Sequence, residues 1–407
     1  MHCACGGTAR ACICKTIERH MYPSVKNADV AGRRVLCRVD MDVPVRDGAV
    51  VSSPRLQAML EMVSFLQERR ARVILMGHRG RPNGPDAALS TKPVCAWLAG
   101  RLPKGMVRFL PFDDYGVLVE EVHAMANGDV LVLENLRFHP AEEQNDSVFA
   151  KQLADLAQLY VNDAFATSHR AHASMVGVPM LMGGYIGLHM ERELEALQVV
   201  REASRRPFVV IIGGAKISSK LEAMEAFLQS ADRVFVGGAI ATTFFAAQGL
   251  NVGASFMMKE EVTDAKRMIE SDRLQLPTDV VLKSRHGYRT ASPGDLRDNE
   301  EIVDIGVSSV RAIQDAVQKA DMFVWNGPVG VVEDARSRAG TDAVAHIVAR
   351  RSRTKAFGVV GGGDTLDVIE TLGIADLYDF VSTGGGAMLK YVGGGVLPAL
   401  EALKKNT

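Results

Sequence analysis

Cationic side chains follow short apolar segments in the first half of the chain, in the stretches GHRGRP (77–82), ENLRFH (134–139) and HRAH (169–172). The carboxyl ends of parallel strands meet at one edge of a sheet, where ligands gather. The guanidinium fork matches the oxygens of a carboxylate or a phosphate. We therefore expect four arginines to converge on one small anion. They are Arg55, Arg81, Arg137 and Arg170. The alternative is that these are scattered surface arginines, each paired with a nearby acid.

Glycine-rich loops follow the apolar segments of the second half. They occupy residues 213–216, 237–239, 326–330, 361–365 and 384–386, and the whole chain holds 38 glycines. Glycine lets the backbone approach a phosphate, and a following helix directs N–H groups and its positive dipole end toward it. Repetition on successive strands favours a nucleotide site over the alternative that glycine simply tightens turns. The P-loop pattern is absent, which excludes a P-loop enzyme. No G-x-G-x-x-G follows a predicted strand, which disfavours dinucleotide binding.

Polar residues beside these glycines have two interpretations each. Asp364 and Thr365 stand at a predicted helix start, where they would be N-caps or would reach Mg²⁺ and a phosphate oxygen. Lys216 and Lys220 are four residues apart and share a face if a helix has already begun there. A cationic site on one domain and a phosphate cradle on another suit phosphoryl transfer between a nucleotide and a small acid, with a hinge that closes and excludes water.

The elements that must position these residues alternate between strand and helix along the chain. The predicted strands are Val35–Val39, Val73–Met76, Val130–Leu133, Leu159–Val161, Phe208–Ile212, Val234–Val236, Met322–Trp325, Phe357–Val360 and Phe380–Val381. Helical periodicity marks Leu56–Arg69, Phe149–Leu156, a connector at Met190–Ala203 and a tail at Leu397–Lys405. Such alternation predicts an α/β fold with parallel sheets covered by helices.

Composition excludes several classes of protein. The chain has 407 residues, 47% of them apolar, and a formal net charge of −1, which fits about two or three globular domains and argues against general binding of nucleic acid or anionic membrane. No apolar run is long enough to cross a membrane. Four of the six cysteines lie in the first 14 residues, where a soft-metal site is an alternative to a disordered extension or a misassigned start over residues 1–20. Cys37 and Cys95 are predicted to be core thiols.

Eight motifs together resemble phosphoglycerate kinase. They are RVDMDVP (38–44), GHRGRP (77–82), ENLRF (134–138), NDAFATSHRAH (162–172), GGAKISSK (213–220), WNGPVGV (325–331), GGGDT (361–365) and STGGGA (382–387). They stand in the family's order from about Met21 to the C-terminus. The resemblance implies two doubly wound, Rossmann-like parallel-sheet domains joined by a helix, with a hinge and a central cleft. It also implies a monomeric cytoplasmic enzyme of glycolysis that transfers a phosphoryl group between 1,3-bisphosphoglycerate and ADP with Mg²⁺.

The resemblance assigns roles to individual residues. Those implied to bind the acid are Asp40, Arg55, His78, Arg81, Arg137 and Arg170, and we expect Asp42 and Arg79 to belong to the same substrate site. Those implied to bind the nucleotide are Gly214, Ala215, Lys216, Lys220, Gly237, Gly238, Gly306, Asn326, Gly327, Val329, Glu333, Gly362, Gly363, Asp364 and Thr365, with Glu333 at the ribose and Asp364 associated with the metal. The groups implied to neutralise the moving phosphoryl group are Arg55, Lys216, Lys220, Gly363 and Gly386.

Two departures from the family pattern bear on the acid site. Asp42 stands where the family usually has Asn, and Arg79 stands where it usually has Leu. A carboxylate about 4 Å from an anionic ligand repels it by up to about 4 kcal/mol at an effective dielectric constant near 20. Our hypothesis is that Arg79 offsets Asp42 as an ion pair at the rim. The alternative is that Arg79 points into solvent while Asp42 accepts a hydrogen bond from the substrate hydroxyl.

The expected organisation follows from these assignments. Residues 21–185 would bind 3-phosphoglycerate, 186–205 would form the connecting helix, 206–392 would bind the nucleotide, and 393–407 would dock back on the first domain. An active phosphoglycerate kinase is the leading interpretation. The alternatives are a divergent relative that acts on another small acyl phosphate and a nucleotide-binding protein without turnover.

Overall fold

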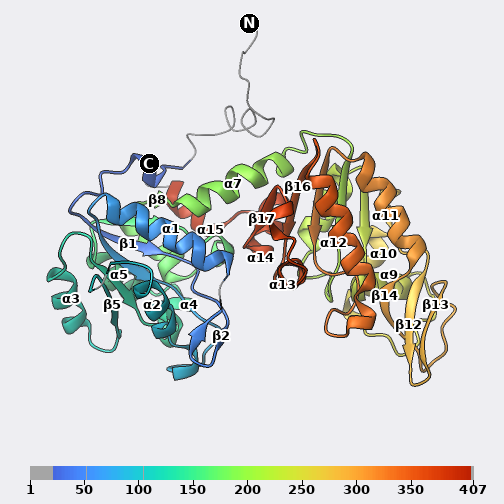
Figure 1. Ribbon diagram of the computed structural model, residues 1–407, viewed down its shortest axis with the longest axis horizontal. Coiled ribbons are helices and arrows are strands. Elements are labelled where there is room, and N and C mark those ends of the chain that lie inside the picture. Colours follow the sequence, from blue (N-terminus) through green and yellow to red (C-terminus); the bar gives the residue numbers. More distant parts are fainter. Residues whose placement is uncertain (1–21, 52, 104, 405–407) are drawn as a thin grey trace, which may run out of the picture. The chain divides into compact units, whose positions relative to one another are not determined.

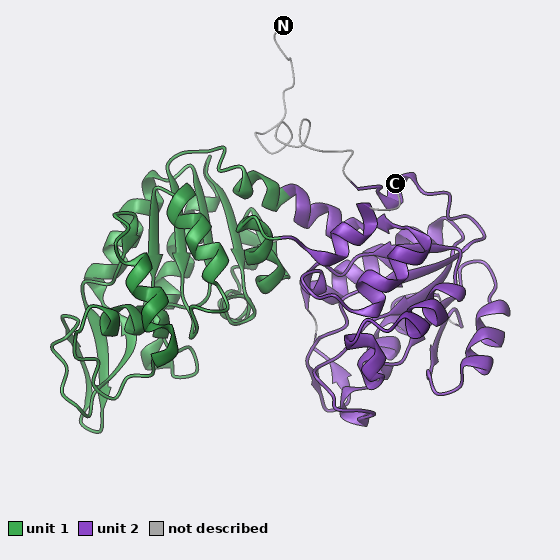
Figure 2. Cartoon of the chain, turned by 180° about the vertical axis from the view of Figure 1, so that it is seen from behind, with its two compact units in different colours: residues 1–14, 196–395 green, residues 15–195, 396–407 purple. Residues whose placement is uncertain are grey.

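The computed structural model describes residues 22–51, 53–103 and 105–404. The chain divides into two compact units, and Figure 2 colours them separately. Unit 1 contains residues 196–395, and the described part of unit 2 contains the residues from 22 to 195 together with 396–404. The predictions for residues 1–20, including the four N-terminal cysteines, lie outside the described residues.

Unit 2 is built on a six-stranded parallel sheet with the order β5-β6-β4-β1-β7-β8. Its strands are β1 (Arg34–Arg38), β4 (Arg72–Met76), β5 (Val107–Leu110), β6 (Val130–Leu133), β7 (Leu159–Asn162) and β8 (Tyr185–Ile186), with a small hairpin of β2 (Val45–Arg46) and β3 (Ala49–Val50). Its helices are α1 (Pro54–Glu68), α2 (Lys92–Ala99), α3 (Tyr115–His123), α4 (Pro140–Glu143), α5 (Ser147–Asp155), α6 (Val178–Met182) and α15 (Pro398–Lys404), with a π-helix, η7, at Ala173–Gly177.

Unit 1 repeats this architecture with the strand order β11-β10-β9-β15-β16-β17. Its strands are β9 (Phe208–Ile212), β10 (Arg233–Val236), β11 (Leu274–Gln275), β15 (Met322–Asn326), β16 (Phe357–Gly361) and β17 (Phe380–Ser382). Its helices are α8 (Leu221–Ser230), α9 (Gly238–Ala247), α10 (Val262–Met268), α11 (Val307–Lys319), α12 (Ala339–Ser352), α13 (Gly363–Thr371) and α14 (Gly385–Val392). A separate antiparallel sheet has the order β13-β12-β14, from β12 (Val280–Ser284), β13 (Gly287–Ala291) and β14 (Glu301–Ile305).

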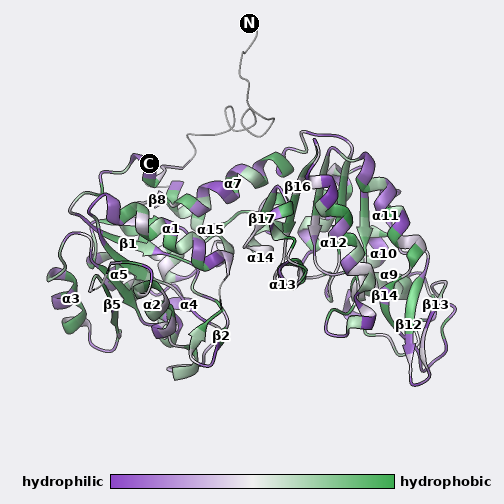
Figure 3. Ribbon diagram, in the orientation of Figure 1, coloured by the Kyte–Doolittle hydropathy of each residue, from purple (hydrophilic) through white to green (hydrophobic). Residues whose placement is uncertain are grey.

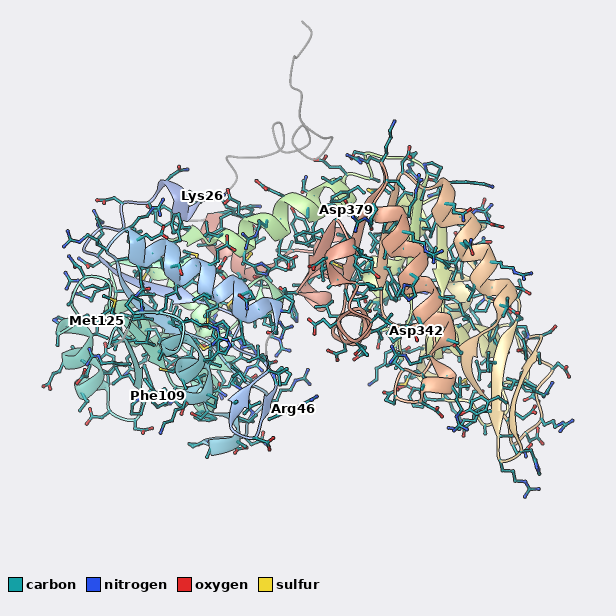
Figure 4. All side chains as sticks on the ribbon, viewed as in Figure 1. Lys26, Arg46, Phe109, Met125, Asp342 and Asp379 are labelled. Atoms are coloured by element: carbon teal, nitrogen blue, oxygen red, sulfur yellow. The ribbon has the colours of Figure 1, made fainter. Side chains whose placement is uncertain are left out.

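Burial explains why these segments form strands. Every residue of β6, β9 and β15 is buried, as expected for parallel strands covered on both faces. Figure 3 shows the contrast between such strands and outer helices such as α11, whose surface carries both polar and apolar residues. Local signals set the helix starts: Ser53 caps α1 and Pro54 occupies its first turn. Figure 4 labels Asp342 in the first turn of α12, where it pairs with Arg338.

The predicted α/β class and all nine predicted strands are confirmed within one or two residues. The helix α7 (Leu188–Arg201), which Figure 1 shows as a single rod, begins two residues before the predicted connector and ends two residues before it does. The antiparallel sheet was not predicted, because β13 is largely polar and none of its residues is buried. Cys37 and Cys95 are buried free thiols, as predicted. None of the helices between residues 22 and 404 combines the length and hydrophobicity that a membrane span needs.

Candidate active site

The sheet of unit 2 brings the predicted cationic loops to one edge. Strands β6, β4, β1 and β7 are neighbours and parallel. Arg137 follows β6, His78 follows β4, Asp40 follows β1, and Arg170 lies in the longer segment after β7. Loops that lie far apart in sequence therefore leave the sheet side by side, as parallel strand order requires.

A cluster of basic side chains forms there and is already desolvated. Arg137 is only 4% exposed, and burial together with the charges of Arg170 and Arg38 lowers its pKa to about 10. Burial and the same arginines hold the pKa of His78 well below its usual value and lower that of His172 to about 3. We call Arg38, His78, Arg137, Arg170 and His172 the basic cluster. These arginines therefore lie close enough to repel one another, and Arg137 also has a local acid, because its Nε lies 3.1 Å from Glu143 Oε1.

Arg38, which the sequence assignments omitted, anchors this cluster. Its buried guanidinium donates to Ser174 Oγ (3.1 Å), to the Val39 carbonyl (2.6 Å) and to His78 Nδ1 (2.9 Å). Because an arginine keeps its protons, His78 Nδ1 must accept, and the imidazole proton stays on Nε2. Nε2 lies 4.0 Å from Asp42 Oδ2. A cation at the end of an otherwise apolar strand is the signal that could have identified Arg38.

A buried glutamate, Glu142, is linked to the basic cluster through Ser174, which also accepts a hydrogen bond from Arg38. Glu142 is fully buried in α4 and accepts from the Ser174 N–H (2.9 Å) and the Ser174 hydroxyl (2.6 Å). The positive field of Arg38 partly offsets the effect of burial, which raises the pKa of Glu142. No pattern in the sequence distinguished this glutamate from its exposed neighbours. Its contribution depends on η7 packing against α4.

The remaining acid-site assignments occupy different environments. Asp40 is 6% exposed and accepts from Thr167 Oγ1 (2.9 Å) and the Ala166 N–H (3.3 Å). Arg55, in the first turn of α1, donates to the Asp42 carbonyl (2.7 Å). Arg81 is exposed. The structure therefore presents Asp40 in a fixed geometry and Arg81 on an open surface.

The structure contradicts both expected placements of Arg79, whereas the hydrogen bond from the substrate hydroxyl to Asp42 stays a prediction. Arg79 is 5% exposed, so it neither points into solvent nor lies at a rim. Its Nη1 donates to the Ser90 carbonyl (2.6 Å) and the Ala88 carbonyl (3.3 Å), with no ion pair to Asp42 within 4.0 Å in the described structure. Asp42 instead accepts the Gly80 N–H at Oδ1 (2.9 Å). The loop after Gly80 folds back over Arg79, which a linear motif does not reveal.

In unit 1, the strand order reverses between β9 and β15, and ligands of doubly wound sheets bind at such a switch point. Lys220 Nζ lies there and donates to the Gly213 carbonyl (2.5 Å) and the Asn326 carbonyl (3.3 Å). Burial lowers its pKa to about 8, and the nearby Asp364 opposes this shift. A desolvated ammonium at a strand edge suits an anionic ligand.

The glycines of the predicted loops fall into two groups. A Cβ on Gly213 would lie 1.9 Å from the Pro328 carbonyl oxygen, and one on Gly237 would lie 2.5 Å from Val329 Cβ, so loop packing requires these two. Gly362, at φ +105°, needs glycine for its backbone conformation. Gly363 is exposed, and a Cβ added there would meet open space. Turn tightening therefore explains part of the pattern, and Gly363 stands free for a ligand.

Lys216 and Lys220 do not share a helix face, because no helix has begun at these residues. Helix α8 begins at Leu221, and Lys220 is its N-cap residue. Lys216 is exposed in the preceding turn. The buried Glu261 holds this turn, because its two carboxylate oxygens accept the Ile217 and Ser218 N–H groups (2.6 and 3.0 Å). Glu261 had no sequence signal.

Asp364 and Thr365 do not cap α13. The N-cap residue is Gly362, without a side-chain cap. Thr365 is buried and its hydroxyl oxygen accepts the Gly327 N–H (2.8 Å), which joins the loops after β15 and β16. Asp364 is exposed in the first turn. Its carboxylate therefore remains accessible to a hard cation that also binds a phosphate.

Most of the other nucleotide-site assignments follow strands of this parallel sheet. Glu333 is exposed in the segment after β15, and Val329 is buried with its N–H on Thr341 Oγ1 (3.1 Å). Gly214 and Ala215 follow β9, Gly238 is the first residue of α9, and Gly386 lies in the first turn of α14. Gly306 differs, because it follows β14 of the antiparallel sheet and is the N-cap residue of α11. Five parallel strands thus carry the predicted loops at their carboxyl ends.

Comparison with known proteins decides the family. The phosphoglycerate kinase family model matches residues 25–395. The chain belongs to this family. It is 41% identical to a phosphoglycerate kinase of Thermosynechococcus vestitus over 92% of this chain and 96% of the relative. It is 42% identical to one of Thermomicrobium roseum over 94% of this chain and 99% of the relative.

Solved structures of phosphoglycerate kinases agree with this assignment. The structure from Coxiella burnetii superimposes with a TM-score of 0.81 at 32% identity, covering 94% of this chain and 99% of that one. The structure from Pyrococcus horikoshii gives a TM-score of 0.82 at 29% identity, covering 94% and 98%. As a member of the phosphoglycerate kinase family, the protein is a nucleotide-dependent phosphotransferase that acts on small molecules.

Proposed function

We propose that the protein transfers a phosphoryl group reversibly between 1,3-bisphosphoglycerate and ADP, giving 3-phosphoglycerate and ATP. The observation that supports this most directly is the basic cluster, in which Arg137 is buried and repelled by Arg38 and Arg170. Such repulsion is relieved by a multiply charged anion, and 3-phosphoglycerate carries both a carboxylate and a phosphate. Family membership supplies the reaction class.

The acid site would work by positioning. Asp40 is held by Thr167 and Ala166, and the neutral His78 presents its Nε2 proton, so both recognise a polar acid in a defined orientation. Arg55, Arg81, Arg137 and Arg170 would hold the anionic groups. Asp42 would contribute its free oxygen, Oδ2, while Oδ1 stays on the Gly80 N–H. No strong general base is needed, because the attacking oxygen is already anionic.

The nucleotide site would work by neutralisation. Lys220 already bridges the carbonyls that end β9 and β15, and a phosphate between those strands would complete its coordination. Lys216, Arg55 and the helix starts at Gly363 and Gly386 would share the charge of the moving phosphoryl group. Because the acid and nucleotide sites belong to different units, transfer requires the units to close around both substrates.

The residues at α13 fit a nucleotide-bound magnesium ion. Asp364 is an exposed carboxylate near Lys220, and Mg²⁺ is commonly held by one or two carboxylates together with substrate phosphates. Mg²⁺ would neutralise phosphate charge when bound. Asp364 would orient it, and Thr365 would fix the neighbouring loop through Gly327.

The proposal includes a monomeric state and a cytoplasmic location. It also includes an acid-binding domain over 21–185, a connector over 186–205, a nucleotide-binding domain over 206–392 and a tail over 393–407 that docks on the first domain. The packing of α15 against η7 and α6 within unit 2 supports this docking of the tail. Asp42 was part of the reason to consider a relative that acts on another small acyl phosphate. That reason is weaker because Asp42 Oδ1 already accepts the Gly80 N–H.

The test is coupled turnover of the purified protein with 3-phosphoglycerate, ATP and Mg²⁺, with the acid titrated to saturation. We expect saturable turnover that falls by about a hundredfold or more in Arg55→Ala and Lys220→Ala, as for other groups that stabilise transition-state charge. Folded wild-type protein that binds ADP without turning over would overturn the proposal. Arg46→Ala, at an exposed residue of β2, is the matched control and should leave turnover unchanged.

A further inference from the structure

Arg79 holds together the two ends of a surface loop. It follows β4, and its guanidinium reaches the carbonyls of Ala88 and Ser90, which close the segment from 80 to 90. Arg79 is 5% exposed, so these charge-assisted hydrogen bonds are shielded from water. Burial lowers the pKa of Arg79, while the negative charges of Asp42 and Glu134 oppose that shift. The arginine therefore remains a cation inside the loop.

Glu134 and Asn135, which follow β6, form hydrogen bonds with the same loop. Glu134 accepts from the Ser90 hydroxyl (2.7 Å) and the Thr91 N–H (2.8 Å). The Asn135 side-chain amide donates to the Arg79 carbonyl (2.7 Å) and the Leu89 carbonyl (2.9 Å). Three side chains from two strand ends thus converge on residues 88–91. The arrangement fixes where the loop leaves β4.

The Gly80 peptide connects this loop to the basic cluster. Its N–H donates to Asp42 Oδ1 (2.9 Å), and its carbonyl accepts from Arg137 Nη1 (2.7 Å). A Cβ on Gly80 would lie 2.8 Å from the Leu89 side chain, so the loop packs directly over this peptide. We therefore expect a shift of residues 88–90 to displace the Gly80 carbonyl, which orients Arg137 together with Glu143, whose Oε1 lies 3.1 Å from Arg137 Nε.

We propose that Arg79 is a positioning residue for the acid substrate: it pins the 80–90 loop so that the Gly80 carbonyl holds the Arg137 guanidinium in its binding geometry. The proposal rests on the proposed function and replaces the expectation that Arg79 itself belongs to the residues that bind the acid. Arg79 reaches the substrate only through Gly80 and Arg137. Arg81 belongs to the same loop, so its position also depends on how Arg79 holds the loop.

The first experiment compares Arg79→Leu with a matched control, Arg72→Leu. Arg72 lies at the opposite end of β4 and donates to the Gly32 carbonyl (2.8 Å), so it resembles Arg79 in strand and bond type but is far along the strand from the loop. We expect Arg79→Leu to raise the KM for 3-phosphoglycerate about tenfold while the KM for ATP stays within about twofold. Arg72→Leu should leave both values unchanged. Equal effects of the two variants, or an unchanged acid KM in folded Arg79→Leu, would overturn the inference.

The second experiment separates positioning from direct contact. If Arg79 acts through Arg137, Arg79→Leu should have little further effect on the acid KM in an Arg137→Met background. Effects that multiply fully in the double variant would indicate independent substrate contacts and overturn the proposal. Both bonds of Arg79 come from Nη1, so Arg79→Lys keeps a charged donor, and we expect its acid KM to lie between those of the wild type and Arg79→Leu. An acid KM above that of Arg79→Leu would contradict the proposal.

A third variant guards against misfolding. Should Arg79→Leu fail to fold, Glu134→Gln loosens the opposite grip on Ser90 and Thr91 and should reproduce the selective rise in acid KM. An unchanged KM in Glu134→Gln would then overturn the inference. Wild-type turnover is measured first: its absence defeats the proposed function itself, whereas normal wild-type turnover with unchanged variants defeats only the role of Arg79.

Discussion

The two units share a doubly wound architecture but differ in the groups that they place at the carboxyl ends of their strands. In unit 2, the loops at the strand ends carry charged side chains, and Arg38, His78 and Arg137 are buried before any ligand arrives. In unit 1, the corresponding loops are mainly glycine backbone with one partly buried lysine, Lys220. The same strand arrangement therefore supports recognition by side-chain charge in one unit and by backbone approach in the other.

The difference lies in what holds each site in place. The basic cluster repels itself, so it depends on buried partners such as Glu142 and Ser174 and on the Gly80 peptide. The glycine loops need no such support, because they pack backbone against backbone, as Gly213 does against Pro328. Side-chain recognition gives a fixed charge pattern suited to one small acid. Backbone recognition suits phosphates, which present similar oxygens whatever they are attached to.

The largest expected effect tests the charged side of this comparison. Arg137→Met removes a buried cation that donates to the Gly80 carbonyl and lies in the field of Arg38 and Arg170. Hydrogen bonds to charged groups contribute about 1.5–3 kcal/mol, so the KM for 3-phosphoglycerate should rise by about ten- to a hundredfold with the KM for ATP unchanged. Steady-state kinetics with each substrate varied in turn provides the measurement. A rise in the ATP KM of the same size would contradict the division of roles between the units.

An intermediate effect concerns Lys220, the partly buried lysine at the switch point of unit 1. The folded-state pKa of Lys220 is lowered to about 8, and an anionic nucleotide favours the protonated form. As pH rises from 7 to 9 the ammonium deprotonates, so ADP affinity should fall by about tenfold if only the charged form binds. Calorimetric titration with ADP across this range measures the change.

Lys220→Arg is the control for this titration, because arginine stays charged up to pH 9. Its ADP affinity should vary little between pH 7 and 9, whatever its absolute value. The same steep pH dependence in Lys220→Arg would show that another group titrates.

The smallest effect tests the backbone side. Gly363→Ala adds a methyl group where the free protein has open space, so the stability of the fold should not fall. The same methyl group would obstruct a phosphate that approaches the start of α13, so the KM for ATP should rise severalfold. Gly213→Ala is the contrasting variant, because its Cβ would meet the Pro328 carbonyl oxygen and should lower the melting temperature. Thermal unfolding and ATP kinetics of both variants separate the two kinds of glycine. An unaltered ATP KM in Gly363→Ala would remove this glycine from the site.

Sequence patterns were most informative where chemistry and periodicity coincide. Buried strands such as β9 are continuous apolar runs, so their positions followed directly, and the residues after them were placed at the correct sheet edge. Polar strands such as β13 carry no such pattern. Arg79 shows the limit within a motif, because its partners at Ala88 and Ser90 are set by how the loop folds back.

The sequence by itself determined the α/β class, the two sets of loops and the family, because these depend on residue types at short, regular spacing. Only the tertiary structure decided that Arg38 and Glu142 support the basic cluster, that Glu261 holds the turn before α8, and that Asp42 and Arg79 do not pair. Those facts depend on hydrogen-bond partners brought together from distant parts of the chain, and a buried polar atom takes whichever partner the packing supplies.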